Sequence, residues 1–328
     1  MKKRLEWKKT AAAALALTCA LTLFGCSSGT ESAEGENAPE AAGEEAAEGG
    51  ETAEPTIVKV GVVGEYNDQW DTINELLKDD NIQVELVKFT DYAAPNRALN
   101  DGEIDLNAFQ HKAFLQNDIA QAGYDIIDIG DTIIAPLAIY NNKDKISSID
   151  EIKDGDVIYI PSDLTNGGRA LKLLEKAGFI ECDPAKGFTP TKADITNYII
   201  DIEIKEAESA TLANILPDCT AAIINGGNAY TAGLDPTSDI IFQEDVNPET
   251  NESIPQLINV IVARTADQDN EVYKKVVDAY HTPEVEQTIL DSYKGAFLCA
   301  WEGAGVYADE AAETAETEAA EAAETEAE

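Results

Sequence analysis

The chain has 328 residues and a formal net charge of −40, so it is strongly acidic and long enough for about two domains. Nucleic acid is excluded as an expected partner, because a phosphate backbone binds to a basic protein face. The acidic residues are unevenly placed, since residues 27–55 and 308–328 hold many of them and no basic residue.

The N-terminus has the pattern of a targeting segment. Met1–Lys9 is basic, Thr10–Phe24 is apolar and too short to cross a bilayer comfortably, and the run ends in L-F-G-C at Cys26. These last four residues resemble a bacterial lipobox, in which the cysteine is acylated and becomes the mature N-terminus. We therefore expect a lipoprotein signal peptide over residues 1–25 and a lipid on Cys26 that anchors the chain to the extracytoplasmic face of the cell membrane. Ordinary secretion and an uncleaved signal anchor are the alternatives.

The acidic stretches on either side of the central region have too few large apolar residues to fold. We expect residues 26–55 to form an extended tether that begins at the lipidated Cys26. Residues 308–328 consist of Ala, Glu, Thr and Asp without an apolar stripe, so we expect a disordered tail.

Between them, strand-like and helix-like patterns alternate in two successive sets. The first set predicts strands at Ile57–Val63, Ile82–Phe89 and Ile104–Phe109. It predicts helices at Trp70–Leu77, from Tyr92 to a stop at Asp101-Gly102, and at His111–Gly123. The second predicts strands at Val157–Ile160, Tyr198–Ile204 and Ala221–Ile224, helices at Ala170–Gly178 and Ser209–Leu216, and a helical region from Asn270 to Leu298. Such alternation predicts mostly parallel sheets. Apolar segments at Thr132–Tyr140 and Ile258–Ala263 join the sets, so we expect two lobes with a cleft between them, lined by the turns that follow the strands.

One of those turns carries an unusual arginine. Residues Ser162–Gly168 read as a glycine-containing turn before a helix, which would place Arg169 in the first helical turn, where the helix dipole disfavours a cation. A bound carboxylate would relieve this conflict and accept a bidentate pair from the guanidinium. The alternative is an arginine paired with a nearby carboxylate, such as Asp163, on a solvated surface.

Five motifs in order resemble the methionine-binding lipoproteins of the MetQ/NlpA type, which are substrate-binding subunits of ABC importers. They are F-T-D-Y-A-A-P-N-R-A-L (89–99), D-L-N-A-F-Q-H-K-A-F-L (105–115), P-S-D-L-T-N-G-G-R-A-L (161–171), A-A-I-I-N-G (221–226) and I-N-V-I-V-A-R (258–264). The resemblance covers about Ile57 to Trp301. It implies an α/β, two-lobed, periplasmic-binding-protein-like (type II) fold with a ligand cleft between the lobes. Lobe 1 would comprise residues 56–138 and 255–307, and lobe 2 residues 139–254.

The resemblance also implies a ligand, roles for seven residues and a set of partners. Methionine, as the L or D form, would be delivered to the permease and ATPase subunits of an ABC importer. Arg169 would hold the ligand carboxylate and Asn166 would help to position it. Asn225 and Asn259 would serve the ammonium or the carboxylate through their amides, which add no net charge. Lobe 1 would line the cleft with Tyr92, Phe109 and His111. Each of these seven side chains also has an ordinary structural reading, as a turn, cap or core residue.

Three positions depart from the family pattern around the methionine side chain. They are Ala135, where an aromatic residue is common, Leu257, and Asn228, which displaces Tyr230 along the chain. The amino-acid headgroup is therefore better supported than the methionine side chain, and Trp70 is a candidate to fill the slot. The alternative ligands are another small amino acid and a methionine-containing dipeptide.

Catalytic motifs are absent from the sequence: it has no nucleophile elbow, no phosphate loop and no metal-ligand spacing, and only two histidines. We expect no enzyme activity, no cofactor and no metal site. A surface lipoprotein enzyme acting on amino acids and an adhesive or signalling lipoprotein are the competing classes. Cys182, Cys219 and Cys299 form no motif, and we expect buried free thiols rather than a Cys182–Cys219 bridge.

Overall fold

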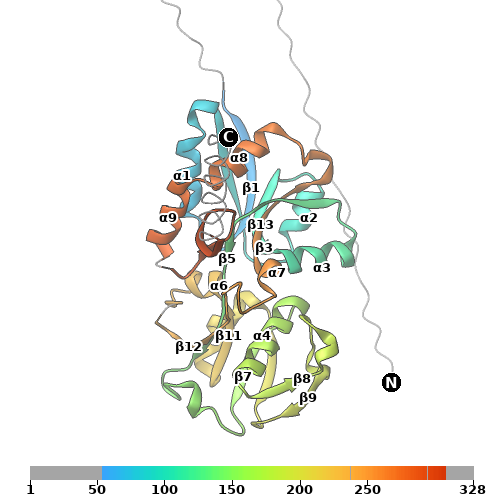
Figure 1. Ribbon diagram of the computed structural model, residues 1–328, viewed down its shortest axis with the longest axis vertical. Helices are drawn as coiled ribbons and strands as arrows, with labels where there is room; N and C mark the ends of the chain where they lie inside the picture. The colour runs from blue at the N-terminus through green and yellow to red at the C-terminus, as the bar shows by residue number, and fades with distance from the viewer. Residues whose placement is uncertain (1–53, 237, 294, 308–328) are drawn as a thin grey trace, which may run out of the picture. The chain divides into compact units, whose positions relative to one another are not determined.

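A computed structural model describes residues 54–236, 238–293 and 295–307 of the chain (Figure 1). The expected signal peptide, the lipidated Cys26, the tether up to residue 53 and the acidic tail lie outside the described residues. Two five-stranded sheets organise the described part, and helices pack on both faces of each. We call the first sheet with its helices lobe 1 and the second lobe 2. The α/β fold predicted from the sequence is confirmed.

The sheet of lobe 1 has the strand order β2-β1-β3-β13-β4. Its strands are rich in β-branched residues, which suit a pleated, buried surface. Their bounds are Ile82–Phe89 (β2), Thr56–Val63 (β1), Leu106–His111 (β3), Asn259–Arg264 (β13) and Ile126–Asp131 (β4). One face is covered by α1 (Asp68–Leu76), α8 (Glu271–Tyr280) and α9 (Pro283–Tyr293), and the other by α2 (Pro95–Asn100) and α3 (Lys112–Ala122).

The sheet of lobe 2 has the order β10-β7-β11-β6-β12. Successive residues of β11 point to opposite faces, so that Ile223 packs under α4 while Ile224 packs under α5 and α6. The strands are Glu203–Ala207 (β10), Val157–Pro161 (β7), Ala221–Asn225 (β11), Leu137–Asn141 (β6) and Ile240–Gln243 (β12). The helices are Leu164–Lys176 (α4), Leu212–Ile215 (α5) and Gly226–Thr231 (α6), and a hairpin of β8 (Ile180–Cys182) and β9 (Ile195–Tyr198) extends the lobe.

Both sheets are mixed: four of the five strands in each run in the same direction, as the alternating pattern predicted, and one strand runs against them. β13 runs antiparallel to β3 and β4, and β6 runs antiparallel to β11 and β12. The reason is connectivity, since β6 and β13 are the strands that the chain enters directly after passing from one sheet to the other. Such a strand has no βαβ crossover to bring it into parallel register.

The two passages between the lobes lie next to each other. The first runs from β4 through β5 (Ile133–Ile134) into β6, and the second runs from β12 through α7 (Ile254–Leu257) into β13. They are joined where the Glu244 backbone N–H donates to the Leu137 carbonyl oxygen over 2.9 Å. β5 also pairs with β14 (Leu298–Cys299). The lobe boundary expected after residue 138 falls inside β6, because the second sheet already begins at Leu137.

Three further elements differ from the sequence predictions. β4 was not predicted, because its sequence I-I-D-I-G-D lacks a clean apolar alternation. The strand expected at Tyr198–Ile204 is split between β9 and β10, since the chain turns where the Ile202 N–H donates to the Ile200 carbonyl. The last helical region is two helices, separated just before Pro283, which lacks a backbone N–H.

Two further features of the described chain concern its cysteines and its helices. Cys182, Cys219 and Cys299 are all buried and unpaired, as expected. Among the described helices, none combines the length and the apolar character needed to cross a lipid bilayer.

Candidate functional site

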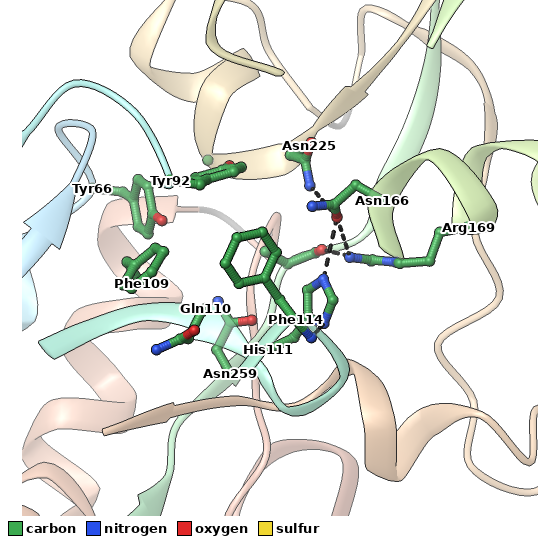
Figure 2. Close-up of a pocket in the computed structure, with 12 residues that line it drawn as sticks. Tyr66, Tyr92, Phe109, Gln110, His111, Phe114, Asn166, Arg169, Asn225 and Asn259 are labelled. Carbon is green, nitrogen blue, oxygen red and sulfur yellow. Dashed lines mark hydrogen bonds between the residues drawn. The ribbon is translucent and has the colours of Figure 1, made fainter. Parts of the chain in front are cut away.

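A cavity between the two lobes collects all seven side chains singled out from the sequence (Figure 2). Lobe 1 contributes the segment after β2, the end of β3 and the start of β13, and lobe 2 contributes α4 and the end of β11. The lining residues are Tyr66, Tyr92, Phe109, Gln110, His111, Phe114, Ala135, Asn166, Arg169, Asn225, Gly227 and Asn259. Sequence reasoning did not single out Tyr66, Gln110, Phe114 or Gly227.

Helix α4 begins earlier than its glycines suggested. Its N-cap is Asp163, whose carboxylate accepts the backbone N–H of Asn166 over 2.9 Å, and Leu164 is the first helical residue. Gly167 and Gly168 are therefore inside the helix, and Arg169 lies in its second turn rather than its first. The expected conflict between the cation and the helix dipole is wrong, because that field is concentrated in the terminal turn.

Arg169 is buried and paired with a carboxylate that the sequence did not reveal. Glu244 follows β12 and accepts from Nε over 3.1 Å and from Nη2 over 2.6 Å, which is a bidentate ion pair. Nη2 also donates to the Ala135 carbonyl over 3.4 Å, and Nη1 donates to the Asn166 side-chain oxygen over 3.2 Å. The surface pairing with Asp163 considered from the sequence does not occur. One Nη1 hydrogen has no partner among the described residues.

Asn166 is the centre of the polar contacts in the cavity. Its Oδ1 accepts from Arg169, from Asn225 Nδ2 over 2.9 Å and from His111 Nε2 over 3.2 Å, as the dashed lines of Figure 2 show. Its Nδ2 donates to both carboxylate oxygens of Asp163, each over 3.1 Å. Asn166 therefore orients one group from lobe 1 and two from lobe 2, and its own amide is fully occupied.

His111 is held as a neutral imidazole of one tautomer. Its Nδ1 accepts the backbone N–H of Phe114 over 3.1 Å and caps α3, so Nε2 must carry the hydrogen that is donated to Asn166. Burial, followed by the nearby charge of Arg169, lowers the pKa of His111 from 6.5 to about 3. His111 thus both caps α3, as one interpretation of the sequence proposed, and lines the cleft, as the other proposed.

Two asparagine side chains leave polar atoms available to an occupant. Asn225 is buried, and its Oδ1 has no hydrogen-bond partner among the described residues. An unpaired buried acceptor costs free energy unless something donates to it. Asn259, at the start of β13, has no side-chain hydrogen bond to any other described residue, although its backbone carbonyl accepts from Thr132 over 2.8 Å. Both residues therefore meet the cavity with unused hydrogen-bonding capacity.

Aromatic rings form the apolar part of the cavity. Tyr92, Phe109 and Phe114 lie with their ring centres 6.0 Å apart in each pair. Tyr66 completes this group on the lobe 1 side of the cavity, and burial raises its pKa to about 12, so its hydroxyl stays protonated. Phe114 was overlooked because it reads as an ordinary core residue of α3, and Tyr66 because it stands in a polar turn.

The departures from the family pattern have distinct structural outcomes. Ala135 lines the cavity and uses its carbonyl oxygen for Arg169. Leu257 does not line it, because it is buried against Ile134 and Ile254. Asn228 donates from Nδ2 to the Tyr92 hydroxyl over 3.1 Å and so joins the lobes. The idea that Trp70 fills the slot is wrong, since Trp70 packs edge-on against Tyr280 in the core of lobe 1.

Metal chemistry has no support in the arrangement of ligating side chains. Within residues 54–236, 238–293 and 295–307, no three His, Cys, Asp or Glu side chains are placed to hold a metal ion. His281, the second histidine, contacts the Asp131 carbonyl from Nε2 over 2.7 Å and stacks on Trp301 away from the cavity.

The chain is similar to several known proteins over most of its folded part. A family model described as NlpA lipoprotein matches residues 58–301. Outer membrane lipoprotein 3 of Mannheimia haemolytica is 41% identical over 246 residues, which are 74% of this chain and 90% of that protein. The D-methionine-binding lipoprotein MetQ of Salmonella typhimurium is 37% identical over 257 residues, 77% of this chain and 92% of that protein. The crystal structure of the substrate binding protein of a methionine transporter from Streptococcus pneumoniae has a TM-score of 0.70 and 35% identity, covering 75% of this chain and 96% of that one.

Proposed function

Because the chain belongs to the NlpA lipoprotein family, a family of non-enzymatic substrate-binding proteins, we propose that it binds methionine outside the cytoplasm and delivers it to an ABC importer. The buried Oδ1 of Asn225 carries this proposal. It is an acceptor with no donor among the described residues, in the same cavity as an arginine that has one N–H not used by any described residue. A zwitterionic amino acid supplies the ammonium for the first and the carboxylate for the second.

The ligand carboxylate would bind to the unused N–H of Arg169, and the ammonium to Asn225 Oδ1. Asn259 would complete the headgroup contacts with its side-chain amide, which has no hydrogen bond to another described residue. Asn166 would act indirectly, because its amide is already committed to Asp163, Arg169, Asn225 and His111. This refines the family expectation, in which Asn166 itself helps to position the carboxylate.

The ligand side chain would lie among Tyr92, Phe109, Phe114 and Tyr66. A thioether is flexible and polarisable, and sulfur contacts the edges of aromatic rings favourably. His111 suits this slot because it is neutral and therefore adds no charge beside an apolar chain. The aromatic rings, which suit a thioether, and the neutral His111 together favour methionine over a polar or charged amino acid.

Membrane attachment is the second part of the proposal. Acylation of Cys26 would fix the N-terminus on the membrane, and residues 27–55 would allow the two lobes to reach the permease. Partner subunits of this importer would be a permease and an ATPase. Mass spectrometry of the membrane-extracted protein tests the anchor, because a mature N-terminus at Cys26 carrying acyl chains is expected and an intact residue 1–25 segment contradicts it.

Native mass spectrometry of the purified protein, before and after ligand removal, tests the ligand. A bound mass equal to that of methionine, followed by saturable rebinding of L-methionine or D-methionine in calorimetry, is the expected result. A panel with leucine, glutamine and alanine serves as the control for the aromatic slot. If the protein binds neither L-methionine nor D-methionine, the proposed function is contradicted.

A further inference from the structure

The carboxylate of Glu244 determines what Arg169 offers to the cavity. Its two oxygens take the Nε and Nη2 edge of the guanidinium, and the Ala135 carbonyl takes the other Nη2 hydrogen. The side chains of Arg169 and Glu244 are only 2% and 13% exposed. A buried cation is thus neutralised by a buried anion, and one Nη1 hydrogen has no partner among the described residues.

Glu244 is itself fixed by the passages between the lobes. Its Oε2 accepts the backbone N–H of Leu137 over 3.1 Å, and its own backbone N–H donates to the Leu137 carbonyl over 2.9 Å. Leu137 opens β6, and Glu244 directly follows β12. The carboxylate cannot leave Arg169 without also breaking its hydrogen bond to Leu137, so the passages between the lobes hold the ion pair in place.

We propose that Glu244 is a positioning residue that makes the cavity selective for ligands without net charge. The inference rests on the proposed function and deepens it. Among the residues that line the cavity and their direct ion-pair partner, Arg169 and Glu244 sum to no net charge and His111 is neutral, while the carboxylate of Asp163 lies behind Asn166 and does not line the cavity. A zwitterion adds no net charge to the site. An anion or a cation of the same shape brings one unbalanced charge into a buried site. Selectivity of this kind is a difference between affinities for related ligands.

A matched ligand series measures this selectivity directly. L-methionine is the zwitterion, 4-(methylthio)butanoate lacks its ammonium and is an anion, and 3-(methylthio)propylamine lacks its carboxylate and is a cation. All three keep the same thioether chain. Calorimetric titration of the purified protein gives the dissociation constant of each, and the ratio of the anion value to the methionine value reports the charge preference.

Glu244→Gln removes the negative charge while keeping a side chain of the same shape and an acceptor oxygen. We expect the ratio of the anion to methionine dissociation constants to fall by about tenfold, because the uncompensated Arg169 now favours an anion. The cation should bind more weakly than before. Glu244→Asp keeps the charge and should leave the ratio near that of the wild type. Glu252→Gln is the matched control, because Glu252 is exposed on the groove beyond Arg169 and loses the same charge without touching it.

Each outcome supports the inference or contradicts it. A uniform change of all three affinities in Glu244→Gln would mean that Glu244 has only a structural role, and an equal shift in Glu252→Gln would reduce the effect to overall charge. If Glu244→Gln unfolds, a changed ratio in Glu244→Asp overturns the inference by itself. Wild-type protein that binds no methionine contradicts the proposed function, whereas wild-type binding with an unshifted ratio in Glu244→Gln contradicts the inference alone.

Discussion

At Arg169, a buried cation keeps one N–H for the cavity because a carboxylate 75 residues later in the chain takes up its other edge. The polar atoms of its neighbours are likewise taken up by hydrogen bonds within the protein. Asn166 Oδ1 receives three donors, and His111 divides its two nitrogens between a helix cap and Asn166. Each polar atom that is already paired narrows the positions open to a ligand, which explains how a few residues can fix the orientation of a small molecule.

Arg169→Ala should weaken methionine binding by about 2–5 kcal/mol, because the ligand carboxylate would remain buried without its cation. Titration calorimetry measures this loss. Arg97→Ala is the control, since Arg97 is exposed on α2 and should not change the affinity. Unchanged affinity in Arg169→Ala would remove the carboxylate assignment. Because Glu244 also loses its partner, melting temperatures of both variants should accompany the titrations.

His111 predicts a specific dependence of stability on pH. Its folded-state pKa of about 3 lies below the ordinary value of 6.5, so the unfolded chain takes up the proton first as the pH falls. Stability from this group is complete above pH 6.5 and is lost progressively below it, by about 2 kcal/mol at pH 5. Urea unfolding at several pH values should show this slope in the wild type and not in His111→Gln. Equal slopes in both proteins would mean that His111 titrates normally.

Local sequence located the residues of the cavity but not the way they are paired. Arg169, Asn166, Asn225 and Asn259 stand in motifs or at the ends of apolar strands, where a polar residue is conspicuous. Glu244 is one carboxylate among many in an acidic chain, and no spacing links it to Arg169. Its role depends on two passages that are far apart in the sequence and lie together in the fold, so long-range topology rather than local pattern decides it.

Among the elements, α4 shows why glycine misled the sequence interpretation. Gly167 and Gly168 normally mark a turn, yet both lie inside a helix here. They are needed for close packing, because a Cβ on Gly168 would lie 2.8 Å from the Thr189 Cα and 2.9 Å from the Phe188 carbonyl oxygen. The backbone of the loop at Phe188 and Thr189 packs directly on α4. That contact positions the turn of α4 that carries Asn166 and Arg169.

Gly168→Ala should therefore destabilise the protein, although alanine favours helix by about 1 kcal/mol over glycine. The clash with backbone atoms cannot be relieved by a rotamer change, so we expect a net loss of about 1–3 kcal/mol. Chemical denaturation measures the free energy of unfolding. Lys176→Ala, in the exposed last turn of the same helix, is the control and should be within about 0.5 kcal/mol of the wild type. A stabilised Gly168→Ala variant would show that the loop moves away freely.

At the scale of the whole described molecule, α6 is a part of lobe 2 that contacts lobe 1 directly. Asn228 donates to the Tyr92 hydroxyl, the Glu65 backbone N–H donates to Thr231 Oγ1 over 3.1 Å, and Tyr230 meets Tyr293 edge-on with ring centres 5.2 Å apart. Gly227 faces the Tyr66 ring with no room for a side chain. These contacts hold the lobes together over the cavity and explain why Tyr230 lies outside it.

Gly227→Ala should hinder this approach of the lobes while leaving each lobe folded, because its new methyl group would overlap the Tyr66 ring. We expect methionine affinity to fall by about tenfold or more, with a melting temperature near that of the wild type in the absence of ligand. Gly227→Ala/Tyr66→Ala removes the obstructing ring and should recover part of the affinity. A variant that binds as tightly as the wild type would show that Tyr66 yields without cost.

Two of the cleft asparagines, Asn166 and Asn225, are each followed by a glycine, and an Asn-Gly pair is the dipeptide most prone to spontaneous deamidation. That reaction begins when the backbone nitrogen of the glycine attacks the asparagine side chain. In the fold, the Gly167 backbone N–H donates to the Asp163 backbone carbonyl oxygen over 2.8 Å, and the Gly226 backbone N–H donates to the Pro136 carbonyl oxygen over 3.1 Å. Both nucleophiles are thus restrained, and both amides are buried. The contacts that shape the cleft therefore also slow deamidation, which would turn its neutral amides into carboxylates. How long the protein keeps an intact cleft thus depends on its remaining folded.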